Sequence, residues 1–177
     1  MNLRHITDVH QQPVLDLETG EMLGHVSSWV INPASQKVVA FTLTKLRGWQ
    51  GTRVVVPADI VEYAPEMIVV QSQNAVIVPD EVAGLAELLD KHLELIGFRA
   101  ETESGKLLGV VSDVVFDTIA STIWQYYIQS LSIVGTMTGN LILSANRVLR
   151  IEKRRIVFPD DILVVTTVVP CEQTQTI

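Results

Sequence analysis

The residue types that most often hold metals or attack substrates are sparse in this sequence. Its four histidines are His5, His10, His25 and His92, and its single cysteine is Cys171. No two histidines have the i,i+4 spacing that places two metal ligands on one face of a helix. Phosphate-binding loops, dinucleotide fingerprints and the G-x-S-x-G nucleophile motif are absent as well. We therefore expect neither a metal site nor a cofactor.

Asp113 and Asp117 are carboxylates whose spacing could suggest acid–base chemistry. Residues i and i+4 of a strand lie on one face, about 13 Å apart. That separation is too long for two carboxylates that share a proton, or that flank one bond in a retaining glycosidase. We expect both aspartates to be turn-forming residues, with Asp117 capping the turn that follows it. The sequence thus predicts no catalytic residue and no enzyme, unless a site is assembled between distant parts of the chain.

A basic run lies towards the C-terminus. Five of the 13 basic residues fall within nine positions: Arg147, Arg150, Lys153, Arg154 and Arg155. Two interpretations stay open. The run is a solvated face, as clustered charges usually are, or it is a contact patch for an acidic partner or anionic lipid headgroups. The whole chain carries a net charge of −7, which disfavours a nucleic-acid binder because such proteins present a basic face.

Trp49 is a second candidate for partner binding. It lies at a predicted hairpin tip between Gly48 and Gly51, where packing into a core is difficult. It either folds back onto its own domain or anchors a partner, since Trp and Arg dominate interface hot spots. Its neighbours Arg47 and Arg53 favour the contact role.

The elements that must position these residues occur twice in the chain. Thr19–Asn32 and Ser104–Asp117 align at an offset of 85 residues, and the glycines of the two segments coincide: Gly20 with Gly105, and Gly24 with Gly109. We expect these glycines to form the turns of hairpins, where a positive φ is needed. An internal repeat predicts two copies of one module instead of a single large domain.

Each copy contains five or six short apolar runs separated by Gly and Pro, which is typical of a small antiparallel barrel or sandwich. We predict a mainly β protein with a first barrel at 1–80, a linker helix at 81–97 and a second barrel at 98–177. Trp124 and Tyr126 fall on the expected core face of the second copy. The alignment of the copies pairs Ile156–Phe158 with Ile68–Val70, now at an offset of 88.

The segment between the copies has helical spacing of apolar residues. Asp80 stands at the expected N-cap and Gly97 at the expected C-terminal glycine. The apolar stripe must be buried, either against one barrel or between the two; it consists of Val82, Leu85, Leu89, Leu93 and Ile96.

The repeat resembles the PRC-barrel family. The resemblance rests on the pattern G-x-x-L-G-x-V, followed by two acidic positions, a β-rich run, the V-P-A-D-I segment at 56–60 and a final I-V-V. It covers Pro13–Val78 and Phe98–Val169. The second copy keeps both acidic positions, whereas the first has Ser28 and Asn32 there, so we expect these positions to serve structure and not catalysis.

The resemblance implies a fold that presents surfaces to large partners. The family takes its name from the cytoplasmic domain of the photosynthetic reaction-centre H subunit, and it includes the C-terminal domain of the ribosome-maturation factor RimM. We expect a non-catalytic adaptor that binds larger proteins and assists the assembly or regulation of a complex, with a photosynthetic setting suggested by the family name alone. An RNA- or ribosome-linked factor and a peripheral membrane protein are the alternatives.

The location of the protein is also an expectation. No apolar stretch approaches the roughly 18–20 residues that span a bilayer, and the N-terminus lacks the apolar core of a signal peptide. We expect a cytoplasmic protein, with peripheral contact to a membrane or membrane complex as the alternative.

Overall fold

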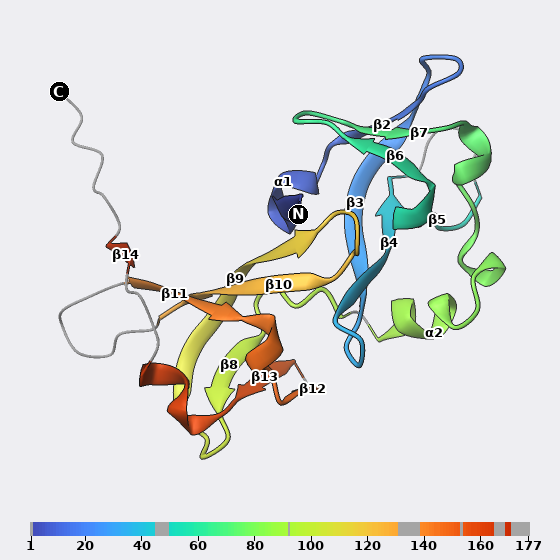
Figure 1. Ribbon diagram of the computed structural model, residues 1–177. Helices are drawn as coiled ribbons and strands as arrows, with labels where there is room; N and C mark the ends of the chain where they lie inside the picture. The colour runs from blue at the N-terminus through green and yellow to red at the C-terminus, as the bar shows by residue number, and fades with distance from the viewer. Residues whose placement is uncertain are drawn as a thin grey trace, which may run out of the picture. The chain divides into compact units, whose positions relative to one another are not determined.

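The chain divides into two units, each with its own sheet. The computed structural model in Figure 1 describes residues 2–44, 50–91, 93–130, 139–152, 154–164 and 169–170. The first unit comprises Met1–Glu94 and Phe116–Ile123, and the second comprises Leu95–Val115 and Trp124–Ile177. The expectation of a mainly β protein is confirmed, since each unit is built on a curled sheet.

The first unit contains a six-stranded sheet in the order β5-β4-β3-β2-β7-β6. The β2 and β7 strands pair in parallel, and the other neighbours run antiparallel. The elements are β1 (Leu3–His5), α1 (Ile6–Val9), β2 (Pro13–Asp16), β3 (Met22–Asn32), β4 (Lys37–Leu43), β5 (Arg53–Val55), the 3-10 turn η1 (Pro57–Asp59), β6 (Ile60–Tyr63), β7 (Ile68–Val70), η2 (Gln73–Ala75), η3 (Pro79–Glu81) and α2 (Leu85–Asp90).

The second unit repeats this strand order. Its sheet runs β12-β13-β8-β9-β10-β11-β14, so β8 to β13 take the places of β2 to β7, and β8 and β13 form the matching parallel pair. The elements are β8 (Arg99–Thr102), β9 (Leu107–Asp117), β10 (Ile123–Gln129), β11 (Gly139–Ser144), η4 (Ala145–Arg147), β12 (Arg150–Glu152), β13 (Arg155–Phe158), η5 (Asp160–Val164) and β14 (Val169–Pro170). The correspondence of β13 with β7 agrees with the offset of 88.

The repeated glycines have two different roles. Gly20 and Gly105 lie in turns with φ of 72° and 87°, as expected. Gly24 and Gly109 lie inside the long strands β3 and β9 instead, beside a register shift in the neighbouring short strand. An added Cβ at Gly109 would lie 2.2 Å from the carbonyl oxygen of Gln129. The prediction that Gly24 and Gly109 are turn residues is therefore wrong: close approach of another backbone is what excludes a side chain at Gly109.

The turn after each long strand is closed by an equivalent side chain. Asp117 Oδ1 accepts hydrogen bonds from the backbone N–H groups two and three residues later, at 2.8 and 3.2 Å. Asn32 Oδ1 accepts the same two bonds at 3.0 and 3.3 Å. Asp113 lies within β9 instead of in a turn, so the prediction that it forms a turn is wrong; its Oδ1 accepts from the N–H of Val114 at 2.7 Å. Carboxylate and amide thus do the same work at the matching position.

The joining helix is much shorter than predicted. In place of a helix over 81–97, α2 spans only Leu85–Asp90, and Asp80 belongs to the preceding 3-10 turn. Gly84, with φ of 74°, has the left-handed conformation that interrupts a helix. Leu85 is nevertheless buried against the first sheet, where it joins a cluster of Val30, Ala40 and Val54. The apolar stripe therefore covers part of the first unit.

The turn between β9 and β10 belongs to the first unit. The Phe116 ring lies 6.2 Å from that of Phe41 and 5.9 Å from that of Tyr63. Thr118 donates from its backbone N–H at 2.9 Å and from its hydroxyl at 3.1 Å to the carbonyl oxygen of Asn2. The observed first unit thus differs from the predicted domain at 1–80 by including α2 and residues 116–123.

The core of the second unit contains only one of the two predicted aromatic residues. Tyr126 is fully buried and its ring lies 6.1 Å from that of Phe158. Trp124 is 44% exposed, so its predicted core position is wrong. The neighbouring Ile123 is buried at the start of β10, but it belongs to the first unit.

Candidate protein-interaction surface

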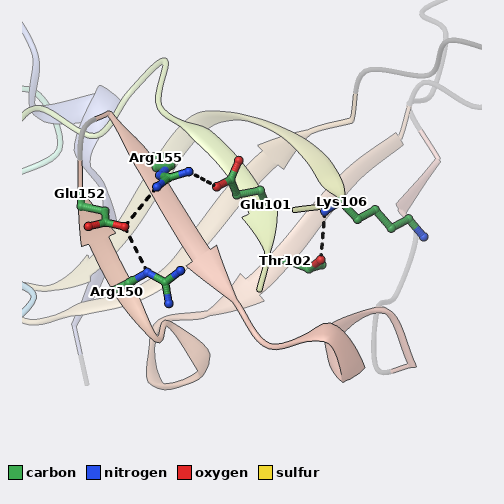
Figure 2. Close-up of polar contacts among 6 residues, drawn as sticks. All are labelled: Glu101, Thr102, Lys106, Arg150, Glu152 and Arg155. Carbon is green, nitrogen blue, oxygen red and sulfur yellow. Dashed lines mark hydrogen bonds and ion pairs between the residues drawn. The ribbon is translucent and has the colours of Figure 1, made fainter. Parts of the chain in front are cut away.

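The basic run of the second unit is compensated by its own carboxylates (Figure 2). Arg155, at the start of β13, contacts Glu101 at 2.9 Å and Glu152 at 3.3 Å. Arg150 on β12 contacts the same Glu152 oxygen at 3.1 Å. The hydrogen bond from Arg150, aided by the charge of Arg155, lowers the pKa of Glu152 below its ordinary value. The charges of Arg150 and Arg155 are therefore already neutralised within the second unit, which makes them less available to an acidic partner.

The other members of the run are partly accounted for. Arg147 pairs with Asp161, and the Arg154 guanidinium lies 5.9 Å from the centre of the Phe98 ring. Lys153 lies outside the described residues. Three of the five basic residues thus pair with acidic groups, which favours the solvated-face interpretation over a free cationic patch.

The hairpin candidates are described only in part. Arg47 and Trp49 lie outside the described residues, so the two interpretations of Trp49 stay predictions. Arg53 is half-buried on β5, beside Leu43 of β4.

Net charge is distributed unevenly between the two units. The first unit contains 13 acidic and six basic residues, for a net charge of −7, whereas the second contains seven of each and is neutral. Residues 54–90 hold no Lys or Arg at all but contain seven acidic residues. The negative charge of the whole chain therefore comes from the first unit.

Part of this acidic stretch forms the last strand of a sheet. The β6 strand pairs with β7 on one side and ends the strand order of the first unit. Asp59, Glu62 and Glu66 are exposed on or beside it. Among the described residues, none of these three carboxylates forms an ion pair. We call Asp59, Val61, Glu62, Glu66 and Ile119 the acidic edge.

Two large apolar side chains stand among these charges. Val61 is 55% exposed and Ile119 is 75% exposed. Both line a groove of about 480 Å³ between β6 and the Thr118–Ile119 turn. A second hollow, of about 470 Å³, lies against η1, β6 and the η2 region, and Val61 also belongs to its wall. An exposed apolar pair rimmed by charged groups is a common feature of protein-binding sites.

The wall of the groove contains a polar group without a hydrogen-bond partner. The hydroxyl of Tyr63 is buried and finds no such partner among the described residues. Burial raises the pKa of this hydroxyl well above its ordinary value, and the nearby charge of Arg4 offsets that only in part. The hydroxyl stays protonated at physiological pH and is available to donate.

A smaller apolar groove, of about 280 Å³, lies beside α2. Leu88, Leu89 and Leu93 line it together with Trp29. The Trp29 indole N–H donates to the Glu94 carbonyl oxygen at 2.7 Å. Trp29 is 8% exposed and belongs to the structure of the first unit, a role that sequence reasoning missed. The acidic edge was missed too, although the absence of Lys and Arg from 54–90 is a signal that could have revealed it.

The structure groups no candidate metal ligands in the part that it describes. Within these residues, no three His, Cys, Asp or Glu side chains are close enough to hold an ion. The His10 ring contacts Trp29 edge-on, with 6.2 Å between the ring centres; His92 and Cys171 lie outside the described residues. Across the same residues, no helix has both the length and the apolar character needed to cross a membrane.

Comparison with known families gives a match within the first unit. Residues 1–78 match the family model of the PRC-barrel domain. The match contains all strands from β1 to β7, and with them most of the acidic edge. No curated protein matches the chain.

Proposed function

Because residues 1–78 are a PRC-barrel domain, we propose that the chain is a non-catalytic adaptor that binds a larger protein and assists the assembly or regulation of a complex. PRC-barrel domains are generally non-catalytic and often act as interaction modules. In this proposal the first unit makes the contact, and the repeated second unit is a further scaffold for the same complex.

The acidic edge carries the proposal. An exposed apolar side chain alone needs no explanation, but Val61 and Ile119 line one groove beside an open sheet edge. The carboxylates around them form no ion pair among the described residues, although the charge of Arg4 lies near Tyr63. Burying the two apolar side chains under a partner contributes about 1–3 kcal/mol each, enough to localise the contact at this edge.

The charge distribution disfavours the two alternatives. RNA and anionic lipid both need uncompensated Lys and Arg. The basic run instead pairs internally with Glu101, Glu152 and Asp161, and the first unit repels polyanions with its net charge of −7. Binding that strengthens at low salt with ribosomal RNA, or with vesicles of anionic lipid, would favour those alternatives instead.

Affinity purification with a matched variant tests the proposal. The tagged full chain is used to capture proteins from a native lysate, in parallel with Val61→Asp and with Leu17→Asp. Leu17 is also 55% exposed and also belongs to the first unit, which makes it a control for surface polarity. We expect one protein to be retained in stoichiometric amounts by the wild type and Leu17→Asp, and to be lost from Val61→Asp.

Two results would contradict the proposal. Retention of the partner by Val61→Asp would remove the acidic edge from the interface. Recovery of no stable partner, together with turnover of a metabolite by the pure protein, would replace the adaptor with an enzyme.

A further inference from the structure

We infer that the occupant of the acidic edge is an extended, basic segment of a partner protein, lying along β6 with an apolar side chain between Val61 and Ile119. This inference rests on the proposed function, since it specifies the chemistry of the partner at the same surface. Its support comes from the open strand, the shape of the groove and the unpaired charge.

Among the described strands, β6 is the unpaired end of the first sheet. At the opposite end, the β5 edge is covered, because Val54 and Ile77 exchange two backbone hydrogen bonds of 3.0 Å. No described strand pairs with the outer side of β6. An open edge presents backbone donors and acceptors, and an extended segment is the form of polypeptide that can use them.

The groove beside β6 has room for a segment of that form. Its far wall is the Thr118–Ile119 turn, which two hydrogen bonds hold to Asn2. The four residues of β6 extend over about 13 Å. A register shift in the β6–β7 ladder falls at Val61, and such bulges redirect side chains. An occupant therefore meets an apolar side chain at the middle of the strand and Ile119 across the groove.

The negative charge around the groove favours an occupant of positive charge. Asp59, Glu62 and Glu66 surround β6, and residues 54–90 contain no Lys or Arg that could screen them. Lys or Arg side chains on an incoming segment gain complementary partners that acidic or neutral segments lack. The occupant is therefore a segment in which apolar and basic residues are mixed.

The same reasoning disfavours two occupants from this chain. A second copy that docks β6 against β6 would bring like charges together at Glu62. A second copy that offers β12 would present arginines already paired with Glu101 and Glu152. The last seven residues, 171–177, contain Glu172 and no Lys or Arg, so charge does not favour the chain's own C-terminus either.

Peptide binding to the full chain tests the inference. The probes are fluorescent peptides of about nine residues, long enough to exceed the length of β6: one alternates Val and Lys, one alternates Val and Glu, and one alternates Gly and Lys. We expect the Val–Lys peptide to bind at least about tenfold more tightly than either of the others, and its affinity to fall as salt is added.

Charge-reversal variants test whether the peptide binds at the acidic edge. Glu62→Lys/Glu66→Lys should weaken the Val–Lys peptide at least about tenfold. Asp8→Lys/Glu21→Lys makes the same change of net charge elsewhere on the first unit, at two other exposed positions, and should weaken it by less than about threefold. Retention of the thermal unfolding transition shows that each variant is folded.

The outcomes separate this inference from the proposed function. Equal affinity for the Val–Glu peptide, or no effect of Glu62→Lys/Glu66→Lys, overturns the inference that the occupant is basic. The proposed adaptor function still stands in that case if a captured partner is lost from Val61→Asp. If the captured partner is retained by Val61→Asp while Glu62→Lys/Glu66→Lys still weakens the Val–Lys peptide, the acidic edge is removed from the proposed adaptor contact but its preference for a basic segment stands.

Discussion

The two units share one strand order and differ most at the strand that ends it. In the second unit, β12 carries Arg150 and Glu152, which pair with each other, and Glu152 also pairs with Arg155 (Figure 2). In the first unit, β6 carries the exposed Val61 and a carboxylate without an ion pair among the described residues. Charged side chains on an edge strand hinder its pairing with another chain, and on β12 the ion pairs hold these side chains in place. The comparison indicates that one copy of the module has a protected edge and the other an edge left available for binding.

Substitution of the two strand glycines, Gly24 and Gly109, tests the strand arrangement that the two units share. Gly109→Ala places a Cβ 2.2 Å from the Gln129 carbonyl oxygen at a φ of 153°, and we expect it to destabilise the protein by about 4 kcal/mol through overpacking and backbone strain. Gly24→Ala meets its nearest atom only at 3.4 Å and should cost about 2 kcal/mol. Denaturant unfolding measures both values. Equal costs would show that the two copies do not differ in the closeness of their strands.

Removal of the ion pairs beside β12 should lower the stability of the protein by a smaller amount. Arg155→Ala removes two ion pairs on the surface of the second unit, and exposed pairs of this kind contribute about 1 kcal/mol or less. Arg99→Ala on β8 is the control, because Arg99 is exposed and forms no ion pair among the described residues. Thermal unfolding should show a modest loss for Arg155→Ala and almost none for Arg99→Ala. Binding of the Val–Lys peptide should not change in either variant.

Acidic pH should produce the smallest effect, and one that both copies share. Burial acts to raise the pKa of Asp16, but backbone N–H donors from Glu18, Thr19 and Gln73 bring it below its ordinary value of 3.8. Hydrogen bonds from Ser104 lower the pKa of Asp160 in the same direction. A carboxyl with a lowered folded-state pKa stabilises the fold above its unfolded-state pKa, and this stability is lost as pH falls through the folded-state value.

Thermal unfolding at a series of pH values checks this. The midpoint should stay level above the ordinary pKa and fall below it, and Asp160→Asn should reduce the slope of that fall. An unchanged slope in Asp160→Asn would show that the Ser104 turn contributes nothing to the acid sensitivity.

Much of the fold could be predicted from sequence because the repeat recurs with its glycines and turn residues. Asn32 and Asp117 cap equivalent turns through equivalent atoms, which short-range patterns reveal. The helix was overestimated because apolar spacing does not show that Gly84 adopts a left-handed φ. The transfer of Phe116 to the first unit depends on contacts with Phe41 and Tyr63, and no local pattern encodes such distant packing.

The candidate site was harder to predict for an electrostatic reason. The basic run is conspicuous in sequence, yet its neutralising residue Glu101 lies 54 positions from Arg155. The acidic edge is inconspicuous because Asp59, Glu62 and Glu66 are spaced among apolar residues. The density of charge along the chain therefore favours the basic run near β12, whose charges are neutralised by ion pairs. The acidic edge at β6 becomes evident only from the strand order.

Amide hydrogen exchange of the full chain, with and without the Val–Lys peptide, tests the central claim most directly. The account predicts slower exchange in residues 58–66 and 118–120 on binding, with no change in residues 149–157. Slower exchange at β12 with none at β6 would contradict the claim that the first unit holds the open edge.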